Sequence, residues 1–377
     1  MEKNIMGSYG PWAANLAKEP GRLSFLNKRF KDINTWQRSA KKKVIELMAG
    51  PNFEKPEIRT EKRYDFDGLY IEELSWQLPY GPRSEAVFLK PADAKGKLPG
   101  ILALHDHAAK KYFGKRKITS TGKKIHPLMQ KHKKEYYGGR AWANELAKRG
   151  YAVLVPDAFL FESRRLRYSD IIHDLTRGRK HKNPENSKEI HDYNEWTRCH
   201  EQYMARSLFC TRTTWPGIFV AEDQCALDIL CTHKDVDAKR IGCGGLSGGG
   251  LRTLYLAGID KRIKSCFCTG FMTTWKDLVL NKSHFHSWMV YLGQAPIYFD
   301  LPEILGLRVP LPTMVLNCRQ DPLFTLKGMK EADRILSQVF KKAGALDKYS
   351  CKFYNGGHKF DAAMQKEAFC WLDKWLK

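Results

Sequence analysis

From Leu98 onward, short runs of apolar residues alternate with longer stretches in which apolar residues recur every three or four positions. Short apolar runs are typical of buried strands, and the longer spacing is typical of helices that bury one face. The alternation predicts an α/β domain with a mostly parallel sheet and helices on both faces. The expected strands are 100–104, 152–156, 240–244, 263–268, 313–318 and 351–354, and the expected helices are 139–149, 217–232, 248–257, 326–342 and 361–375.

The chain before Leu98 follows a different pattern. Large apolar residues lie scattered among charges in residues 1–50 and predict helices that cover the main body, so residues 1–60 are expected to form an N-terminal helical extension. Two runs rich in aromatic and β-branched residues, 63–77 and 85–90, flank a proline- and glycine-containing turn and predict an antiparallel hairpin. Residues 61–377 are then expected to form one domain, with irregular insertions near 110–134, 159–215 and 271–312.

The sequence Gly245-Leu246-Ser247-Gly248-Gly249 lies between an expected strand and an expected helix. A serine on a sharp strand-to-helix turn exposes its hydroxyl, and the flanking glycines let neighbouring backbone pass close by. A glycine-rich turn that contains a serine is more often only structural. The strand before the turn and the helix after it favour Ser247 as a catalytic nucleophile.

A serine nucleophile needs a base and an orienting carboxylate, here in the order Ser, Asp, His. Asp321 follows the expected strand 313–318, and His358 follows the last expected strand. The non-catalytic alternatives are a helix N-cap for Asp321 and an ordinary surface histidine for His358. Their positions at strand ends favour the catalytic interpretation.

The negative charge that develops on an attacked carbonyl needs backbone N–H donors. Gly248, directly after the nucleophile, supplies one, and His107, in the loop His105 to Ala109 after the first core strand, is expected to supply the second. His105 and His107 around Asp106 could instead suggest a metal site. No further ligand set is evident, so we expect no metal.

The insertions also contain residues that could line a substrate pocket. Aromatic residues in such segments more often pack the insertion onto the body of the protein. The candidates for the pocket are Tyr112, Phe161, Trp275, His286 and Trp288.

The formal net charge of +23 over 377 residues could indicate a nucleic acid or an acidic polysaccharide as partner. The lysines are dispersed and no nucleic-acid motif accompanies them, which favours a solvated basic surface. The ten cysteines avoid CxxC pairs and predict free thiols. The sequence predicts no membrane span and a cytoplasmic protein, or a secreted one if a leader is missing.

With these residues in view, the chain resembles the α/β-hydrolase superfamily, particularly the dienelactone hydrolase-like branch that includes acetyl xylan esterases. The resemblance runs from Leu98 to the end and includes His105-Asp106-His107, the stretch 240–249, Asp321 and His358, while Tyr9-Gly10-Pro11-Trp12 also looks like members of that branch. It implies the α/β-hydrolase fold and hydrolysis of acetyl or other short acyl esters, on a carbohydrate or a small molecule, without a cofactor.

Two features depart from that branch, the composition of the loop and the identity of the nucleophile. It usually has glycines in the loop where this chain has Asp106, Ala108 and Ala109, and a carboxylate beside a developing oxyanion would be unfavourable unless it faced away. The nucleophile is a serine and not the cysteine of true dienelactone hydrolases, which disfavours opening of that type of lactone.

The expected function is therefore that of a serine esterase acting through an acyl-enzyme. A serine peptidase of related fold and a non-catalytic polyanion-binding protein on a hydrolase scaffold remain as alternatives. The sequence leaves open the acyl group, the alcohol and the oligomeric state, a homo-oligomer included.

Overall fold

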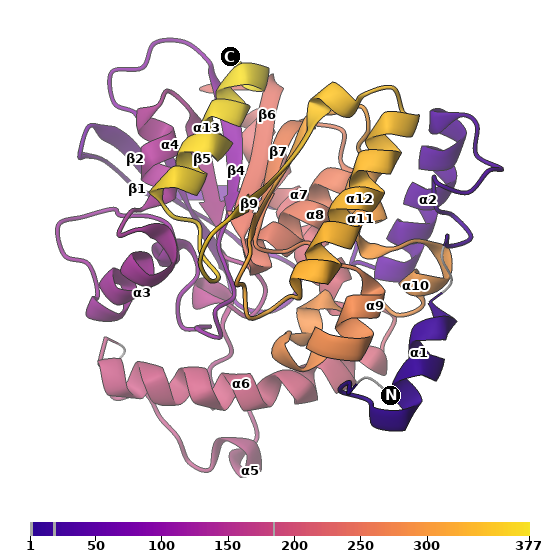
Figure 1. Cartoon of the computed structure of the whole chain (residues 1–377). Helices are drawn as coiled ribbons and strands as arrows, with labels where there is room; N and C mark the ends of the chain where they lie inside the picture. Colours follow the sequence, from indigo (N-terminus) through magenta and orange to yellow (C-terminus); the bar gives the residue numbers. More distant parts are fainter. Residues whose placement is uncertain (1–2, 18–19, 184) are drawn as a thin grey trace.

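The structure is a computed structural model that describes residues 3–17, 20–183 and 185–377. Its centre is a nine-stranded sheet in the order β1-β2-β3-β5-β4-β6-β7-β8-β9 (Figure 1). Strands β4 to β9 pair in parallel, whereas β1, β2 and β3 are antiparallel and join the rest through an antiparallel β3–β5 pair. The strands are β1 Ile58–Phe66, β2 Leu69–Trp76, β3 Ser84–Pro91, β4 Leu98–Leu104, β5 Ala152–Pro156, β6 Val236–Leu246, β7 Ile263–Thr269, β8 Thr313–Cys318 and β9 Tyr349–Tyr354.

Helices cover both faces of the sheet. Helices α4 and α13 pack their apolar residues on one face, and α2, α7, α8, α11 and α12 share a larger core on the other. The helices are α1 Gly10–Leu16, α2 Ile33–Met48, α3 Pro127–Tyr137, α4 Trp142–Lys148, α5 His173–Thr176, α6 Ser187–Phe209, α7 Trp215–Thr232, α8 Gly248–Ile259, α9 Trp275–Asp277, α10 Ala295–Tyr298, α11 Leu301–Gly306, α12 Leu326–Lys342 and α13 Ala362–Leu376. Within the described ranges, no helix is long and apolar enough to cross a membrane.

The expected α/β architecture with a mostly parallel sheet and an N-terminal helical part is confirmed. All six expected core strands are present, and α12 has the predicted bounds. The predicted hairpin is incomplete, because the run 63–77 is itself folded back at Asp67-Gly68 into β1 and β2. Both turn residues have positive φ, 54° and 75°, a combination that Asp-Gly adopts readily in tight hairpins.

Strand β1 forms one edge of the sheet. Most of its residues are exposed, and its register with β2 shifts between Thr60 and Lys62.

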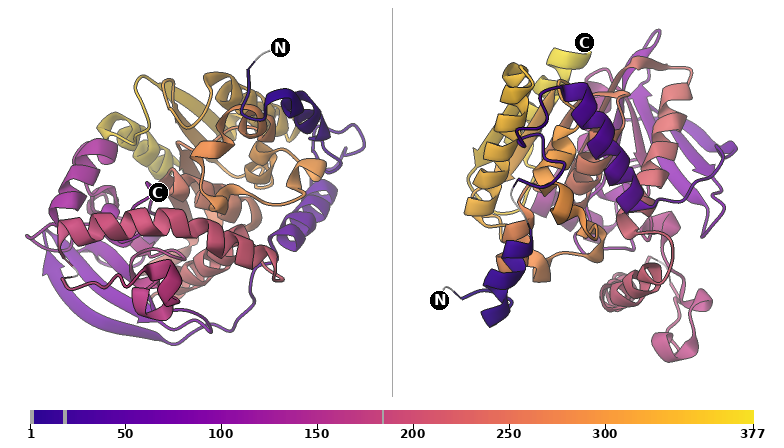
Figure 2. Two further views of the ribbon diagram at one scale, coloured as in Figure 1. Left: turned by 90° about the horizontal axis from the view of Figure 1, so that it is seen from below. Right: turned by 90° about the vertical axis from the view of Figure 1, so that its right-hand side faces the viewer.

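The segments expected to be irregular contain regular helices. Helix α6 spans 23 residues inside the expected insertion 159–215 and crosses the lower edge of the sheet in Figure 1, which Figure 2 (left) shows from below. Its buried side includes the polar residues Asn194, Thr197, His200 and Glu201. A helix that buries polar side chains lacks the apolar periodicity by which helices are predicted, and α6 was missed for that reason.

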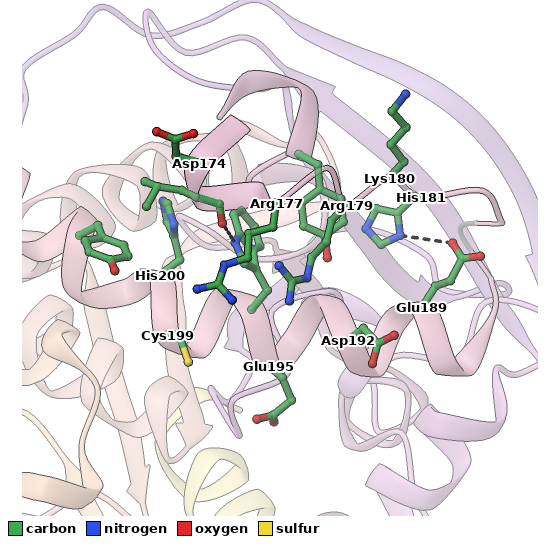
Figure 3. A pocket seen from close by; sticks show the side chains of 14 residues that line it. Asp174, Arg177, Arg179, Lys180, His181, Glu189, Asp192, Glu195, Cys199 and His200 are labelled. Carbon is green, nitrogen blue, oxygen red and sulfur yellow. Dashed lines mark hydrogen bonds and ion pairs between the residues drawn. The ribbon is translucent and has the colours of Figure 1, made fainter. Parts of the chain in front are cut away.

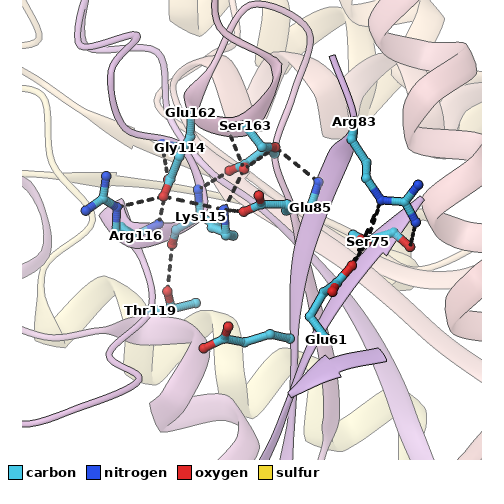
Figure 4. Close-up of polar contacts among 12 residues, drawn as sticks. Glu61, Ser75, Arg83, Glu85, Gly114, Lys115, Arg116, Thr119, Glu162 and Ser163 are labelled. Atoms are coloured by element: carbon cyan, nitrogen blue, oxygen red, sulfur yellow. Dashed lines mark hydrogen bonds and ion pairs between the residues drawn. The ribbon is translucent and has the colours of Figure 1, made fainter. Parts of the chain in front are cut away.

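A buried ionic cluster ties the segment after β4 to the segment after β5. Lys115 Nζ lies 2.7 Å from Asp157 Oδ2 and 3.4 Å from Glu162 Oε1, and Arg116 Nε donates to Glu162 at 2.6 Å (Figure 4). Burial would raise the pKa of Glu162, but Lys115 and Arg116 lower it to about 2. The carboxylate therefore stays charged and fixes the start of the insertion.

The pH dependence of stability can test whether the ammonium group of Lys133 is buried. It is buried on α3, where Nζ donates to Thr119 O at 2.6 Å, and burial lowers its pKa to about 8. The unfolded chain, with a lysine pKa near 10.4, binds this proton more tightly, so folding should become more favourable as the pH rises from 8 to 10.

We expect the free energy of unfolding of the wild type, relative to Lys133→Met, to increase by about 2 kcal/mol between pH 7.5 and pH 10 in urea titrations. Lys134→Met, an exposed position on the same helix, should show no such difference. Equal pH dependence of the wild type and Lys133→Met would contradict the burial of this ammonium group.

Candidate active site

Ser247 occupies the sharp turn between β6 and α8. Its backbone angles are φ 59° and ψ −118°, a strained combination for a residue with a side chain. Its N–H donates to Thr269 O at 2.9 Å, which fixes the turn against the end of β7. A Cβ at Gly245 or Gly249 would lie 2.3 Å or 2.1 Å from Leu104 O, so the flanking glycines are required by the close approach of β4.

His358 and Asp321 lie on neighbouring loops that follow β9 and β8. His358 Nδ1 donates to Asp321 Oδ2 at 2.6 Å, and the other carboxylate oxygen accepts the N–H of Leu323 at 2.9 Å. The two loops are joined by further bonds, among them Arg319 N to Tyr354 O at 2.8 Å. The carboxylate thus fixes the imidazole tautomer with its proton on Nδ1, and Nε2 carries the lone pair.

The second imidazole nitrogen of His358 makes no hydrogen bond within the part of the protein that the structure describes. His358 Nε2 is enclosed and has no hydrogen-bond partner among the described residues, Ser247 included. Gly270 follows Thr269, whose carbonyl oxygen accepts the N–H of Ser247. A Cβ added at Gly270 would lie 3.0 Å from His358 Cε1, so the imidazole ring packs against this segment. Ser247 and His358 also line the same cavity. Catalytic hydrogen bonds often tighten only when substrate is bound, and this arrangement allows that.

A buried lysine holds the peptide between Asp106 and His107 by its carbonyl oxygen. Lys117 Nζ donates to Asp106 O at 2.8 Å and to His107 O at 2.9 Å. In a trans peptide the N–H points opposite to the carbonyl, so the amide of His107 points away from Lys117. A Cβ at Gly248 would lie only 2.9 Å from His107 N. The two expected donors are therefore adjacent.

Asp106 faces away from this pair of amides. Its Oδ1 accepts hydrogen bonds from Tyr137 Oη and from His132 Nε2, the latter at 3.1 Å, and Oδ2 lies 3.6 Å from Lys117 Nζ. Burial would raise the pKa of this carboxyl, but its contacts with His132 and Lys117 hold it well below its usual range. The carboxylate is thus the counter-ion of the lysine that orients the loop.

The cavity above Ser247 has a volume of about 520 Å³. His286 and Trp288 line it, as the sequence predicts, and His286 Nε2 donates to Leu323 O at 3.0 Å. Burial lowers the pKa of His286 to about 4, so its ring is neutral. Other parts of the wall are Tyr136, Arg198, Glu201, Gln202, Phe271 and Phe285.

Three of the expected pocket residues do not line this cavity. Tyr112 packs with Tyr168 and Tyr193 in a separate apolar cluster under α6. Phe161 is buried behind the loop, with its ring centroid 5.3 Å from that of His107, and Trp275 is buried where its indole donates to Phe299 O. These aromatic residues pack the insertions onto the body instead, because large apolar rings are stabilised most by full burial.

Two residues that sequence reasoning missed stand out. Glu201 reaches the cavity from α6, and Lys117 is completely buried below the loop. Neither belongs to a motif, and a charged residue in a polar segment gives no sequence signal of its own burial. Within the described part of the chain, no group of three or more His, Cys, Asp or Glu residues is arranged to hold a metal ion.

A second cavity, of about 660 Å³, lies between α6 and the segment around α5 (Figure 3). Charged residues of both signs surround it, including Arg177, Arg179 and Asp192. Ser247, Asp321 and His358 are not part of its wall. Ser247 and His358 line only the first of these two cavities.

Known proteins share this architecture. No family model matches the chain. A Bacillus subtilis protein, YtaP, provisionally named a hydrolase, is 24% identical over 307 residues, which are 81% of this chain and 88% of that protein. A solved Bacteroides fragilis structure, provisionally named an acetyl xylan esterase, gives a TM-score of 0.67 and 17% identity over 93% of this chain and 83% of that one. A glucuronoyl esterase from Teredinibacter turnerae gives a TM-score of 0.59 and 13% identity over 96% and 90%. The chain has the α/β-hydrolase fold.

Removing the charge of Asp106, which is buried beside Lys117, should lower the stability of the fold considerably. Asp106→Asn keeps the shape of the side chain but leaves the Lys117 ammonium without a counter-ion. We expect the free energy of unfolding, measured in urea, to fall by about 3 kcal/mol. The exposed Asp93→Asn should change it by less than about 0.5 kcal/mol. An unchanged stability of Asp106→Asn would contradict the role of Asp106 as counter-ion.

Proposed function

We propose that the protein is a serine esterase that cleaves carboxylic esters through an acyl-enzyme. One observation carries this proposal. His358, held by Asp321 at 2.6 Å, has an Nε2 without a hydrogen-bond partner in the described ranges and lines the same cavity as Ser247 and the loop of His107. A base with a fixed tautomer beside a strained serine is the arrangement that nucleophilic catalysis requires.

In the first step, Ser247 Oγ attacks the ester carbonyl carbon and His358 Nε2 takes the hydroxyl proton. The carbonyl π electrons move to the oxygen, which becomes the oxyanion of a tetrahedral intermediate. When the intermediate collapses, the bond to the alcohol oxygen breaks and the imidazolium returns the proton to that oxygen. Asp321 stabilises the imidazolium during this step.

In the second step, water attacks the acyl-enzyme while His358 Nε2 again takes a proton. The new intermediate collapses, Ser247 Oγ leaves and is reprotonated, and the carboxylic acid is released. In both steps the N–H groups of His107 and Gly248 stabilise the oxyanion. Gly248 also begins α8, so the positive end of the helix dipole adds to the effect.

The substrate we propose is an acetyl or other short acyl ester of a carbohydrate or a small molecule. Aromatic residues of the wall, such as Phe285 and Trp288, can pack against a sugar ring or an acyl chain. The similar structures named as an acetyl xylan esterase and a glucuronoyl esterase support a carbohydrate ester. The first panel to test comprises acetylated sugars, methyl uronates and p-nitrophenyl esters.

Replacement of the nucleophile tests the proposal directly. Ser247→Ala should lower kcat/KM for p-nitrophenyl acetate by at least about 10⁴-fold and abolish labelling by a fluorophosphonate probe. Its melting temperature should equal that of the wild type, and the exposed Ser169→Ala should keep full activity. Undiminished hydrolysis by Ser247→Ala would refute the proposal.

The same assays separate the two alternative functions. If the wild type cleaves amides in preference to esters, a peptidase is favoured. If it binds polyanions in a salt-sensitive way and is not labelled by the fluorophosphonate, a binding protein is favoured.

The close contact of Gly248 with His107 gives a second test. The added Cβ of Gly248→Ala would lie 2.9 Å from His107 N and 3.0 Å from His107 Cβ, so the loop must move. We expect kcat to fall by about 100-fold, as for loss of one oxyanion donor. Gly122→Ala, where an added Cβ meets nothing within 4 Å, is the matched control and should behave as the wild type. Full activity of Gly248→Ala would argue against these donors.

A further inference from the structure

The side chain of His107 connects the oxyanion loop to helix α6. His107 Nε2 lies 2.7 Å from Glu201 Oε1, although the two residues are far apart in the sequence. The same carboxylate oxygen accepts a hydrogen bond from the buried Lys111 Nζ. Glu201 therefore joins the inserted helix to two positions of the segment that follows β4.

The hydrogen bonds of His107 define its tautomer. Nδ1 accepts the N–H of Ala109 at 3.0 Å, so Nδ1 carries the lone pair and Nε2 carries the hydrogen that is donated to Glu201. Both nitrogens are then engaged, and this imidazole has no free nitrogen to act as a base. Its side chain closes a tight turn over Ala108 and fastens that turn to α6.

The turn requires stabilising side-chain contacts because it contains no glycine. Ala108 and Ala109 adopt φ values of 42° and 52°, in the left-handed region that residues with a Cβ disfavour. Strained backbone of this kind persists only where surrounding contacts hold it. Lys117 holds the carbonyl side of the loop, and the side-chain bond from His107 to Glu201 holds the other side.

We propose that Glu201 is a positioning residue that sets the oxyanion amide of His107 through the histidine side chain. This inference rests on the proposed esterase function, because it assigns a role to that amide. The inserted helix α6 thus contributes to the reaction by fixing a donor beside Ser247, in addition to forming part of the cavity wall.

The electrostatics of Glu201 agree with this role. Burial would raise the pKa of its carboxyl, but the charge of Lys111 and the hydrogen bonds from Lys111 and His107 hold that pKa well below its usual range. The carboxylate stays ionised at neutral pH and can accept both donors at once. A glutamine at this position could offer one amide oxygen to both donors, but without the negative charge that attracts the Lys111 ammonium group.

Glu201 also lines the cavity, so a direct contact with substrate is the competing explanation. The two explanations differ in their coupling to His107. A positioning role requires the imidazole, so removing Glu201 should have no further effect once the imidazole is gone. A direct contact would lower activity independently and would raise KM.

The test is a double-mutant cycle with p-nitrophenyl acetate as the substrate. Glu201→Gln and His107→Ala should each lower kcat by about tenfold with KM within twofold, and the double variant should also lose about tenfold. The rate of labelling by a fluorophosphonate should fall in parallel. His107→Gln, which keeps a donor for Glu201 and an acceptor for Ala109 N, should recover most of the activity. Asp192→Asn, an exposed carboxylate of the same helix, serves as the control.

Additive losses, approaching 100-fold in the double variant, or an unchanged kcat in Glu201→Gln would overturn the inference. If Glu201→Gln does not fold, His107→Ala and His107→Gln test the same link, because the ion pair of Glu201 with Lys111 remains in both. Full activity of His107→Ala would then overturn it. The outcome is separable from that of the proposed function, since an inactive Ser247→Ala combined with an unaffected Glu201→Gln would refute only the positioning role.

Discussion

The buried Lys117 fixes the orientation of a single peptide group, between Asp106 and His107, at the wall of the cavity that Ser247 also lines. The carbonyl of this peptide group is bound by Lys117, and its nitrogen lies so near Gly248 that a Cβ added there would come within 2.9 Å. Burying the lysine is unfavourable, and burial lowers its pKa to about 8 in spite of the nearby carboxylate. Asp106, His132 and Tyr137 form the polar surroundings that make this tolerable. A buried charge is retained here because it orients backbone.

The strained serine turn depends on the same close packing. Ser247 lies where β4, β6 and β7 end side by side, and the glycines around it allow Leu104 O to come within a distance that no Cβ would permit. The strands supply rigidity, whereas the loops after β8 and β9 supply the carboxylate and the imidazole. Parallel strands bring residues from distant parts of the sequence to one edge of the sheet, as is usual for this class of fold.

Local patterns explain what the sequence could predict. The apolar core strands, helix α12 and the glycine-rich turn at Ser247 are each encoded within a few neighbouring residues, and their positions along the chain were predictable. Asp321 and His358 were identifiable as candidates because they follow strands, and the structure brings them together.

Buried polar contacts are not encoded in this way. Lys117 and Glu201 acquire their roles only through partners elsewhere in the fold, and a lysine or glutamate in a charged segment looks like surface. The same difficulty concealed α6, whose buried side is partly polar. Tyr112 and Trp275 lie away from the pocket for another reason, because aromatic side chains in a loop can pack into the core as readily as they line a cavity. The turn at Asp67-Gly68 did carry a local signal, which the longer aromatic run around it obscured.

The exposed edge strand β1 has a consequence for how the molecule behaves among its own copies. An unpaired strand edge can template the addition of strands from another chain, which leads to aggregation. Here that edge carries Arg59, Lys62 and Arg63, and the break in register after Thr60 interrupts its hydrogen-bonding row. Lysine and arginine side chains on such an edge repel a second copy. With Glu61 and Asp65 on the same strand, the edge is densely charged and is a poor template for a tenth strand.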